Sequence, residues 1–419
     1  MFKKYIRLVT VIAITAFLPM PAYCQANDSR IQSVLETLGE GLRNKDMQLI
    51  RKTFSEDVSI STEMGAGTNN LLETILQHVN FGAVELLPGS IQTGKDTVYV
   101  NVRFVLQQSK PQESIIAFDS ENKILFIDYF DRLFGQSRYR KSSLAAVIPF
   151  RQKGQSIVLS VKLNNNGHRL SFLLDTGADG MAIKKSLADS LGIKANYTQN
   201  TNIVGGRTQV SISSENTVHL TDSLSLTGQN MAIFDKIGNN LDGIIGLNLI
   251  KKYITKIDFD NQKIYLYSFG DYHYAGDDIT IPVRMHRALV IIPSELGITE
   301  MQSVMGNFLL DTGANYNLIA FSNFVREKQL LQSGFKPESM GTTVSMGYST
   351  PVYHGKAYEF RVGNIIKNNI PVTLQASALN SSTHNDEIDG SIGIQFWAGY
   401  NLIIDLLKKE IRLTPRKYT

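Results

Sequence analysis

Cysteine is nearly absent from this chain, whose 419 residues include only Cys24. A single thiol excludes an intrachain disulfide and a zinc site built from cysteine ligands. The seven histidines show no H-E-x-x-H or comparable spacing of metal ligands. We therefore expect neither a metal ion nor another cofactor.

A charge excess of either sign is also absent. The chain has 42 Lys and Arg against 38 Asp and Glu, a formal net charge of +4, and no basic run is longer than three residues. A nucleic-acid-binding protein needs a concentrated basic face. The sequence therefore predicts no nucleic-acid partner.

Long apolar runs are missing except near the N-terminus. There, residues 8–18 are uncharged and largely apolar, and they follow the basic residues Lys3, Lys4 and Arg7. Small residues and prolines then lead to Ala26. This pattern predicts a signal peptide over residues 1–26, because the apolar run is too short to span a bilayer.

The mature protein is accordingly expected to be exported, either periplasmic or secreted, with no integral membrane span. Cleavage after Ala26 places Cys24 at the −3 position. The alternative is a lipoprotein anchored through Cys24. We prefer cleavage, because Tyr23 is bulkier than the residue that a lipoprotein signal usually accepts before its cysteine.

The rest of the composition is that of a packed globular protein. Hydrophobic residues make up 43% of the chain and charged residues 19%. Because 419 residues are too many for one ordinary domain, we expect two or three folded parts after the leader.

Residues 27–140 are predicted to form a small α+β domain. A first helix is predicted from Ile31 onward and a second from Met47 to Phe54. Strands are predicted at Thr97–Leu106, where apolar residues alternate strictly with others, and at Ile124–Phe130. Helices followed by antiparallel strands give an α+β layout, similar in its order to small NTF2-like domains. The first helix is marked by apolar residues at helical spacing: Ile31, Val34, Leu35, Leu38 and Leu42.

An internal repeat organises the remaining chain. Residues 171–178 have the sequence S-F-L-L-D-T-G-A, and residues 307–314 have N-F-L-L-D-T-G-A. Other landmarks recur in the same order, which predicts two copies of one lobe, at residues 141–272 and 273–419. The matched landmarks are Ile148-Pro-Phe-Arg with Ile281-Pro-Val-Arg, Asp242-Gly-Ile-Ile-Gly-Leu with Asp389-Gly-Ser-Ile-Gly-Ile, and Ile257-Asp-Phe with Ile404-Asp-Leu.

Each copy is predicted to be mainly β. Its short apolar segments are broken by Gly and Asn, as strands joined by turns require. One helix is expected after each D-T-G-A segment, over residues 184–191 in the first copy and 321–331 in the second.

Each D-T-G segment predicts a loop that presents a carboxylate at the end of an apolar strand, since Gly177 and Gly313 permit a sharp turn. Two such loops meeting at a pseudo-twofold axis would bring Asp175 and Asp311 within hydrogen-bonding range. Carboxyls that close share one proton, because both cannot easily be ionised. The ionised one can take a proton from water while the other donates to a carbonyl oxygen, which hydrolyses an amide without a metal.

These segments resemble the active-site loops of aspartic proteases. Residues 173–179, L-L-D-T-G-A-D, are similar to the active-site segment of retropepsins, and residues 242–246 resemble the element that packs behind it in retropepsins and pepsins. The resemblance covers about Leu144 to Leu413 and is nearest to bacterial exported retropepsin-like proteins. It implies a mainly β, two-lobed acid-protease fold. It also implies an enzyme that cleaves peptides or proteins bound in an extended conformation.

The resemblance also implies roles for individual residues. Asp175 and Asp311 would be the catalytic pair, with Thr176 and Thr312 cross-linking the two loops and Gly177 and Gly313 holding substrate or water close to the backbone. A flap hairpin is expected between each loop and the glycine element downstream of it, residues 242–246 in the first copy and 389–393 in the second. The flap candidates are Gly205 and Gly206, within residues 203–208, and Gly347 and Tyr348, within residues 346–350.

The second copy departs from the first at two positions. Ser391 replaces an apolar residue, and Asn315 stands where the first copy has Asp179; neither is expected to touch the catalytic carboxyls. In both copies alanine, Ala178 and Ala314, stands where pepsin-like enzymes often carry a hydroxyl that stabilises the ionised pair. Without that hydroxyl the shared proton should persist to higher pH, so we expect a pH optimum nearer neutrality than pepsin's.

Two alternatives remain open at this point. A catalytically idle protein that binds a peptide or small ligand is the second functional hypothesis, because a fold does not guarantee activity. Residues 27–140 are a candidate regulatory or dimerising domain. With both Asp loops in one chain, we expect a monomer, or a dimer formed through that domain.

Overall fold

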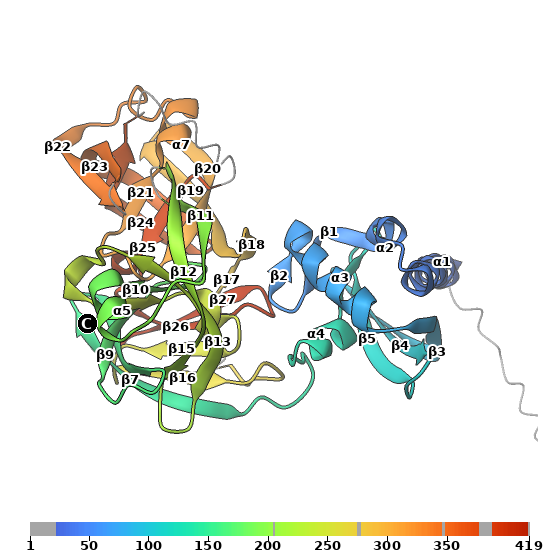
Figure 1. Ribbon diagram of the computed structural model, residues 1–419. Coiled ribbons are helices and arrows are strands. Elements are labelled where there is room, and N and C mark those ends of the chain that lie inside the picture. Colours follow the sequence, from blue (N-terminus) through green and yellow to red (C-terminus); the bar gives the residue numbers. More distant parts are fainter. Residues whose placement is uncertain (1–21, 204–205, 275–277, 346–347, 377–387, 418–419) are drawn as a thin grey trace, which may run out of the picture. The chain divides into compact units, whose positions relative to one another are not determined.

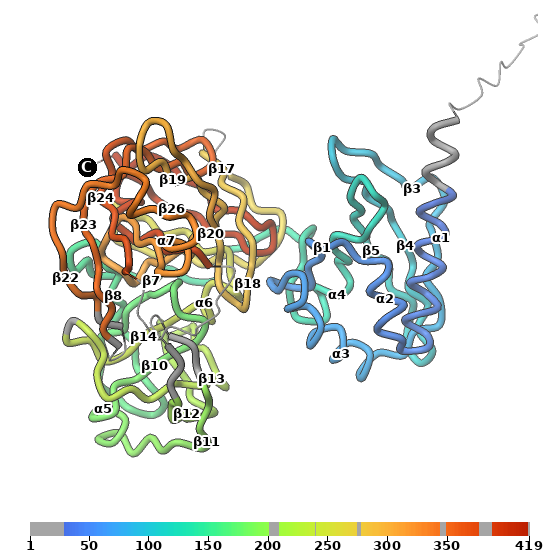
Figure 2. The backbone as a smooth tube through the Cα atoms, turned by 90° about the horizontal axis from the view of Figure 1, so that it is seen from above, coloured from blue at the N-terminus to red at the C-terminus, as the bar shows by residue number. Residues whose placement is uncertain are grey.

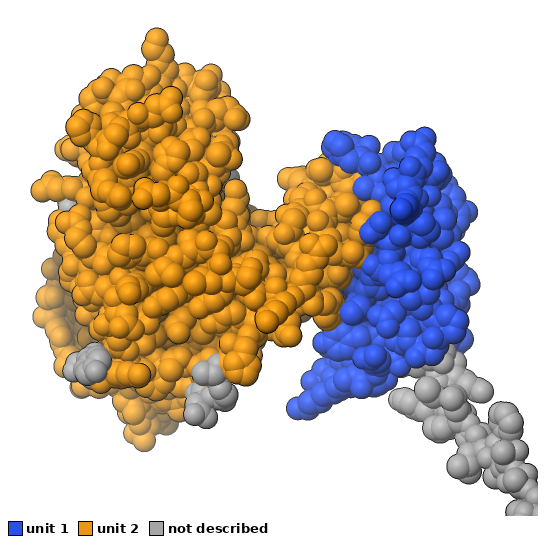
Figure 3. All heavy atoms as spheres, turned by 90° about the horizontal axis from the view of Figure 1, so that it is seen from below, with its two compact units in different colours: residues 1–55, 76–126 blue, residues 56–75, 127–419 orange. Residues whose placement is uncertain are grey.

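The computed structural model describes residues 22–203, 206–274, 278–345, 348–376 and 388–417. Contacts divide the chain into two compact units, coloured in Figure 3: unit 1 is Met1–Ser55 with Leu76–Phe126, and unit 2 is Glu56–Ile75 with Ile127–Thr419. Most of the predicted signal peptide lies outside the described residues. The expected cleavage site after Ala26 falls within the first helix, and cleavage stays a prediction.

The described residues of unit 1 form two helices and three long strands. Strand β4 pairs antiparallel with both β3 and β5. Helix α1 buries Ile31, Leu35, Leu38 and Leu42, whereas Val34, the fifth residue whose spacing predicted the helix, is only partly buried. The NTF2-like assignment stays a prediction. The elements are α1 (Ala22–Asn44), α2 (Met47–Thr53), β3 (Phe81–Thr93), β4 (Val98–Leu106) and β5 (Gln112–Phe118).

Shorter elements lie in unit 2 or at the boundaries between the units. The predicted strand Ile124–Phe130 is too long, since β6 ends at Ile127 and helix α4 follows. Asp128 and Asp131 lie in the first turn of α4, where acidic side chains favour a helix. These elements are β1 (Phe54–Ile60), β2 (Glu63–Met64), η1 (Gly65–Thr68), α3 (Asn69–His78), β6 (Ile124–Ile127) and α4 (Asp128–Leu133).

The first lobe is mainly β, as the sequence predicts (Figure 1). Helix α5 occupies most of the helix expected over residues 184–191. The elements are β7 (Leu144–Lys153), β8 (Ser156–Leu163), β9 (Leu170–Leu174), β10 (Met181–Lys184), α5 (Lys185–Ser190), β11 (Tyr197–Ile203), β12 (Gly206–His219), β13 (Ser225–Phe234), η2 (Gly238–Asn240), β14 (Gly243–Ile245), α6 (Leu247–Ile250), β15 (Ile254–Asp258) and β16 (Lys263–Tyr267).

The second lobe has the same character. Its helix α7 is shorter than the helix expected over residues 321–331, because Gln329 adopts a positive φ of 52°. The elements are β17 (Ile279–Pro282), β18 (Arg284–His286), β19 (Leu289–Thr299), β20 (Gln302–Asp311), β21 (Leu318–Ala320), α7 (Ser322–Glu327), β22 (Pro337–Ser345), β23 (Tyr348–Val362), β24 (Ile365–Gln375), β25 (Gly390–Gly393), η3 (Ile394–Trp397), β26 (Tyr400–Asp405) and β27 (Glu410–Pro415).

The two lobes have the same strand order. In the first it is β11-β12-β13-β10-β14-β9-β8, and in the second it is β22-β23-β24-β21-β25-β20-β19. The additional pairing of β12 with β8 is matched by that of β23 with β19. The colours in Figure 2 run from green to yellow over the first lobe and from yellow through orange to red over the second. The two-lobed, mainly β fold predicted from the sequence is confirmed.

Strands from both lobes join in a central set with the order β7-β16-β15-β26-β27-β17. Its middle pair, β15 and β26, is antiparallel, with Ile257 opposite Leu402. The outer strands β7 and β17 carry the matched segments that begin at Ile148 and Ile281. The order is therefore symmetric about its centre: β15 corresponds to β26, β16 to β27 and β7 to β17, so the two lobes are related by an approximate twofold axis.

Aromatic side chains fill the core of the second lobe. Phe308 on β20 contacts Phe324 and Phe360, and Phe396 contacts both Phe360 and Trp397, all edge to face with ring centroids 4.7–5.8 Å apart. Such pairs add to the stabilisation from burying each ring, about 2–3 kcal/mol per side chain. Since Phe308 lies three residues before Asp311, this core fixes the strand that presents that carboxylate.

Candidate active site

Asp175 directly follows strand β9, and Asp311 is the last residue of strand β20. Strand β14 runs parallel to β9, and β25 runs parallel to β20 with Phe308 opposite Gly390. The apolar residues that precede each aspartate are buried. Each carboxylate therefore emerges from the end of a strand held on both faces, as the sequence predicts.

Glycines on the neighbouring strands allow this close packing. A Cβ on Gly243 would lie 2.4 Å from the ring of Phe172, and one on Gly390 would lie 2.7 Å from the ring of Phe308. Any larger residue would push the strand that carries the aspartate out of place.

Aspartates beside these glycines fix the same strands by hydrogen bonding. An oxygen of Asp242 accepts from the backbone N–H of Ser171, and an oxygen of Asp389 accepts from that of Asn307, both at 2.7 Å. The repeated Asp-Gly element thus acts alike in the two lobes.

Thr176 and Thr312 link the two loops reciprocally. Each backbone N–H donates to the hydroxyl of the other threonine, at 3.1 and 3.0 Å. The Thr176 hydroxyl donates to the carbonyl oxygen of Leu310 at 2.7 Å, and the Thr312 hydroxyl donates to that of Leu174 at 3.0 Å. Both threonines are fully buried. Four hydrogen bonds therefore join the loops of the two lobes where the aspartates emerge.

Asp175 and Asp311 lie together and hydrogen-bond to each other. The N–H of Gly177 donates to Asp175 Oδ1 at 2.8 Å, and that of Gly313 donates to Asp311 Oδ1 at 3.1 Å. A Cβ on Gly313 would lie only 2.3 Å from the carboxyl carbon of Asp175. Each loop glycine thus leaves room for the opposite carboxyl.

The environment raises the pKa of both aspartates. Burial, together with the negative charge of Asp311, raises the pKa of Asp175 to about 8. Burial also raises the pKa of Asp311, while hydrogen bonds from Tyr316 and Ser391 oppose the rise. Both aspartates keep partial solvent accessibility. The pair can therefore hold one proton between two carboxyls near neutral pH while remaining reachable by water.

Sequence reasoning missed two residues of the site. The hydroxyls of Tyr316 and Ser391 donate to Asp311 Oδ2 at 3.1 and 3.2 Å. The expectation that Ser391 stays away from the carboxyls is therefore wrong, because the parallel pairing of β25 with β20 places it opposite Leu309. The signal was its departure from the first copy, where an isoleucine stands.

The premise drawn from Ala178 and Ala314, that no hydroxyl stabilises the ionised pair, is wrong, while the expected pH optimum nearer neutrality stays a prediction. Neither alanine carries a hydroxyl, but hydroxyls from elsewhere reach Asp311. Asn315, the other departure, is exposed and accepts a hydrogen bond from Gln395. Hydroxyl stabilisation is thus supplied to one member of the pair.

Two of the four flap candidates, Gly206 and Tyr348, lie in strands of two hairpins. Strands β11 and β12 pair antiparallel up to Ile203 and Gly206, and β22 and β23 up to Ser345 and Tyr348. Gly205 and Gly347 lie outside the described residues, while Gly206 and Tyr348 begin strands β12 and β23. The structure therefore has a hairpin at each predicted place, and the flap role stays a prediction.

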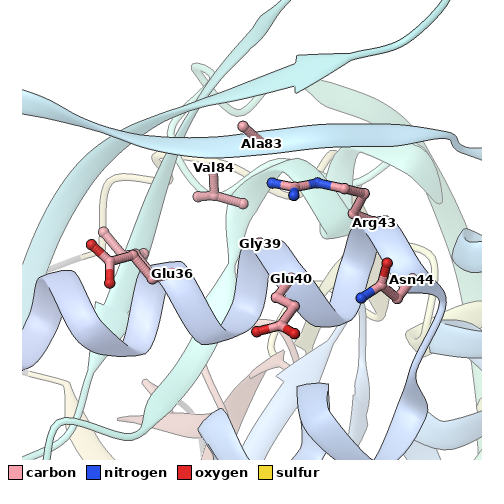
Figure 4. Close-up of a pocket in the computed structure, with 8 residues that line it drawn as sticks. Glu36, Gly39, Glu40, Arg43, Asn44, Ala83 and Val84 are labelled. Carbon is pink, nitrogen blue, oxygen red and sulfur yellow. The ribbon is translucent and has the colours of Figure 1, made fainter.

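Over the part of the chain that the structure describes, no three His, Cys, Asp or Glu side chains are arranged to hold a metal ion. No described helix is long and apolar enough to cross a membrane. A hollow of about 370 Å³ lies in unit 1 (Figure 4) and is lined by Leu35, Glu36, Gly39, Glu40, Arg43, Asn44, Ala83 and Val84.

Comparison with known proteins gives a family match within the first lobe. The aspartyl protease family model matches residues 159–249, which include the first Asp-Thr-Gly loop and the glycine element behind it. An aspartic proteinase from Irpex lacteus is similar in structure, with a TM-score of 0.43 and 14% sequence identity over 67% of this chain and 98% of that chain. No curated protein matches. The family match lies within the first lobe, whose Asp-Thr-Gly loop meets that of the second lobe.

Proposed function

We propose that this chain is an exported aspartic endopeptidase, which hydrolyses peptide bonds with a water molecule activated between Asp175 and Asp311. The observation that carries the proposal is the hydrogen-bonded carboxyl pair. Reciprocal hydrogen bonds of the two threonines hold the loops that carry it, and burial raises the pKa of Asp175. The matching strand orders support the predicted internal duplication behind it.

The pair can supply both proton transfers of amide hydrolysis. The ionised carboxylate takes a proton from the water, whose oxygen bonds to the carbonyl carbon, while the protonated carboxyl gives its proton to the carbonyl oxygen. A neutral gem-diol results. The proton taken from the water then passes to the amide nitrogen, the C–N bond breaks, and a diol hydroxyl returns a proton to the other carboxylate. An acid and an amine leave, and the pair is restored.

Activity is expected nearest to neutral pH. The reaction needs one proton on the pair, and a pKa of about 8 for Asp175 keeps that proton in place through neutrality. A rate profile that peaks well below pH 4 would contradict this assignment.

The substrate is expected to be a peptide or protein in an extended conformation. Hairpins β11–β12 and β22–β23 each offer backbone groups that can pair with such a chain and exclude water on closing. Hydrogen exchange with and without a bound peptide inhibitor tests this role. Slower exchange at residues 203–208 and 345–350 is expected, and unchanged exchange at both would contradict it.

A peptide-library digest between pH 3 and 8 tests the activity itself. Pepstatin-sensitive cleavage is expected from the wild type, and Asp175→Asn or Asp311→Asn should abolish it. Asp222→Asn, at an exposed aspartate of the same lobe, is the matched control and should cleave normally. If the folded wild type cleaves nothing, the chain is instead a binding protein with a protease fold.

Export and assembly need their own measurements. Expression with cell fractionation should give an extracytoplasmic protein whose measured mass is that of a chain beginning at Asn27. A lipid-modified Cys24 would replace that conclusion with membrane anchoring. Sedimentation should show a monomer, or a dimer that is lost when residues 27–140 are removed.

A further inference from the structure

We propose that the hydroxyls of Tyr316 and Ser391 divide the two proton-transfer roles between the aspartates. Asp311 is the ionised member that takes the proton from water, and Asp175 is the protonated member that donates to the substrate carbonyl. This assignment rests on the proposed function and names the part that each carboxyl plays in it. Tyr316 and Ser391 are positioning residues, because they act through Asp311.

The geometry places three oxygens in mutual hydrogen-bonding contact. Tyr316 Oη lies 3.1 Å and Ser391 Oγ 3.2 Å from Asp311 Oδ2, and the two hydroxyl oxygens are 2.9 Å apart. Each hydroxyl has one proton to donate. Either both protons point to Asp311, or one hydroxyl donates to the other and that one donates to Asp311. Every such arrangement stabilises a negative charge on Asp311 Oδ2.

The first lobe has no counterpart of this pair. In the aligned repeats, Gly180 occupies the position of Tyr316 and Ile244 that of Ser391. Ile244 pairs with Leu173 on β9 just as Ser391 pairs with Leu309 on β20. The backbones are therefore equivalent while the side chains differ, so the two aspartates of an otherwise symmetric pair have unequal surroundings.

The backbone holds Tyr316 in place. The N–H of Gln395 donates to the Tyr316 carbonyl oxygen at 3.2 Å, and the N–H of Gly393 donates to that of Asn317 at 3.0 Å. A Cβ on Gly393 would lie 2.7 Å from the tyrosine ring, so glycine is needed there to admit the ring. Ser391 is almost fully buried. Both hydroxyls therefore belong to a packed site with little freedom to turn away.

The groups that face Asp311 favour its ionised form. The Gly313 N–H and the two hydroxyls stabilise the Asp311 anion, and Asp175 is the acidic group opposite it. Burial keeps the pKa of Tyr316 well above its ordinary value, so its hydroxyl stays a donor across the working pH range. The hydrogen bond within the pair then runs from Asp175, which holds the proton, to Asp311.

Removing either hydroxyl tests the assignment through the pH profile of kcat/KM. Tyr316→Phe and Ser391→Ala should each move the acid limb upward by about one pH unit, because a hydrogen bond to a charged group stabilises it by roughly that amount. Tyr358→Phe, at an exposed tyrosine, and Ser294→Ala, at a buried serine of the same lobe, are matched controls with an unmoved limb. An unmoved acid limb with a uniformly lower rate in both test variants would overturn the proposal.

A second measurement does not depend on activity. Isotope-edited infrared titration can follow Asp311 alone in Asp175→Asn, and Asp175 alone in Asp311→Asn. Of the two carboxyls, Asp311 should ionise at the lower pH. Adding Tyr316→Phe should raise the pH at which Asp311 ionises and leave the pH at which Asp175 ionises unchanged. The opposite order would overturn the assignment even in an active enzyme. An inactive wild type with the expected order would overturn only the proposed peptidase.

Discussion

The backbone N–H of Thr176 donates to the hydroxyl of Thr312 at 3.1 Å, and the N–H of Thr312 donates to the hydroxyl of Thr176 at 3.0 Å. Each hydroxyl also donates to a carbonyl oxygen of the opposite lobe. Since both residues are fully buried, water cannot replace these partners. The distance between the two aspartates therefore depends on hydrogen bonds that belong to neither lobe alone.

Replacing one of these threonines by valine should loosen the pair. Thr312→Val removes a hydroxyl donor and leaves the buried N–H of Thr176 without its acceptor, which should cost about 1–3 kcal/mol of unfolding free energy. Urea unfolding measures the loss. Thr280→Val, at an exposed strand position, is the control. Costs that simply add in the variant carrying both Thr176→Val and Thr312→Val would contradict a shared network.

Stability should depend on pH through Asp175. Its pKa is raised from 3.8 to about 8 in the folded protein. Below about pH 4 the group is protonated in both states, whereas between pH 4 and 8 the unfolded chain ionises first, so folded stability is lost as pH rises. Asp175→Asn should therefore have a higher Tm than wild type at pH 7, and an equal one near pH 4. Asp179→Asn should match wild type at both pH values, and a gain for Asp175→Asn that is the same at pH 4 and pH 7 would exclude this cause.

Alanine at the loop glycines should lower activity in a graded way. A Cβ on Gly313 would lie 2.3 Å from the carboxyl carbon of Asp175, and one on Gly177 would lie 2.9 Å from that of Asp311. Displacing a catalytic group by about 1 Å can cost 100-fold in rate. Gly313→Ala should therefore lower kcat/KM by at least about 100-fold, and Gly177→Ala should lower it less. Gly167→Ala is the control and should leave kcat/KM unchanged, because a Cβ at Gly167 meets no atom within 4 Å. Equal rates for all three would contradict this packing.

Alanine at Gly243 should act on stability. Its Cβ would lie 2.4 Å from the Phe172 ring and 2.6 Å from the carbonyl oxygen of Ala182. Overpacking of this kind costs about 1–3 kcal/mol or more, which thermal unfolding should register as a lower Tm. Gly238→Ala, with open space around it, should change the Tm little. A Tm for Gly243→Ala equal to that of the control would show that β9 and β14 can separate without loss.

Local patterns in the sequence predicted much of the fold. The alternation of apolar residues located β4, and the repeated landmarks predicted two mainly β lobes, whose strand orders match. Errors fell where a local feature ended an element early. Asp128 begins a helix where a strand was expected to continue, and Gln329 adopts a positive φ where a helix was expected to continue. Periodicity reports the face of an element better than its end.

By itself the sequence determined that two Asp-Thr-Gly loops exist and that the chain repeats, because both facts lie in contiguous segments. Only the tertiary structure decided that Tyr316 and Ser391 reach Asp311. The parallel pairing of β20 with β25 brings Ser391 there, and the backbone N–H of Gln395 holds Tyr316. The exchange of Ile244 for Ser391 was visible in the repeat, but its meaning depends on which side chain faces the carboxyl. Contacts between distant segments follow from strand pairing and packing, which no local pattern specifies.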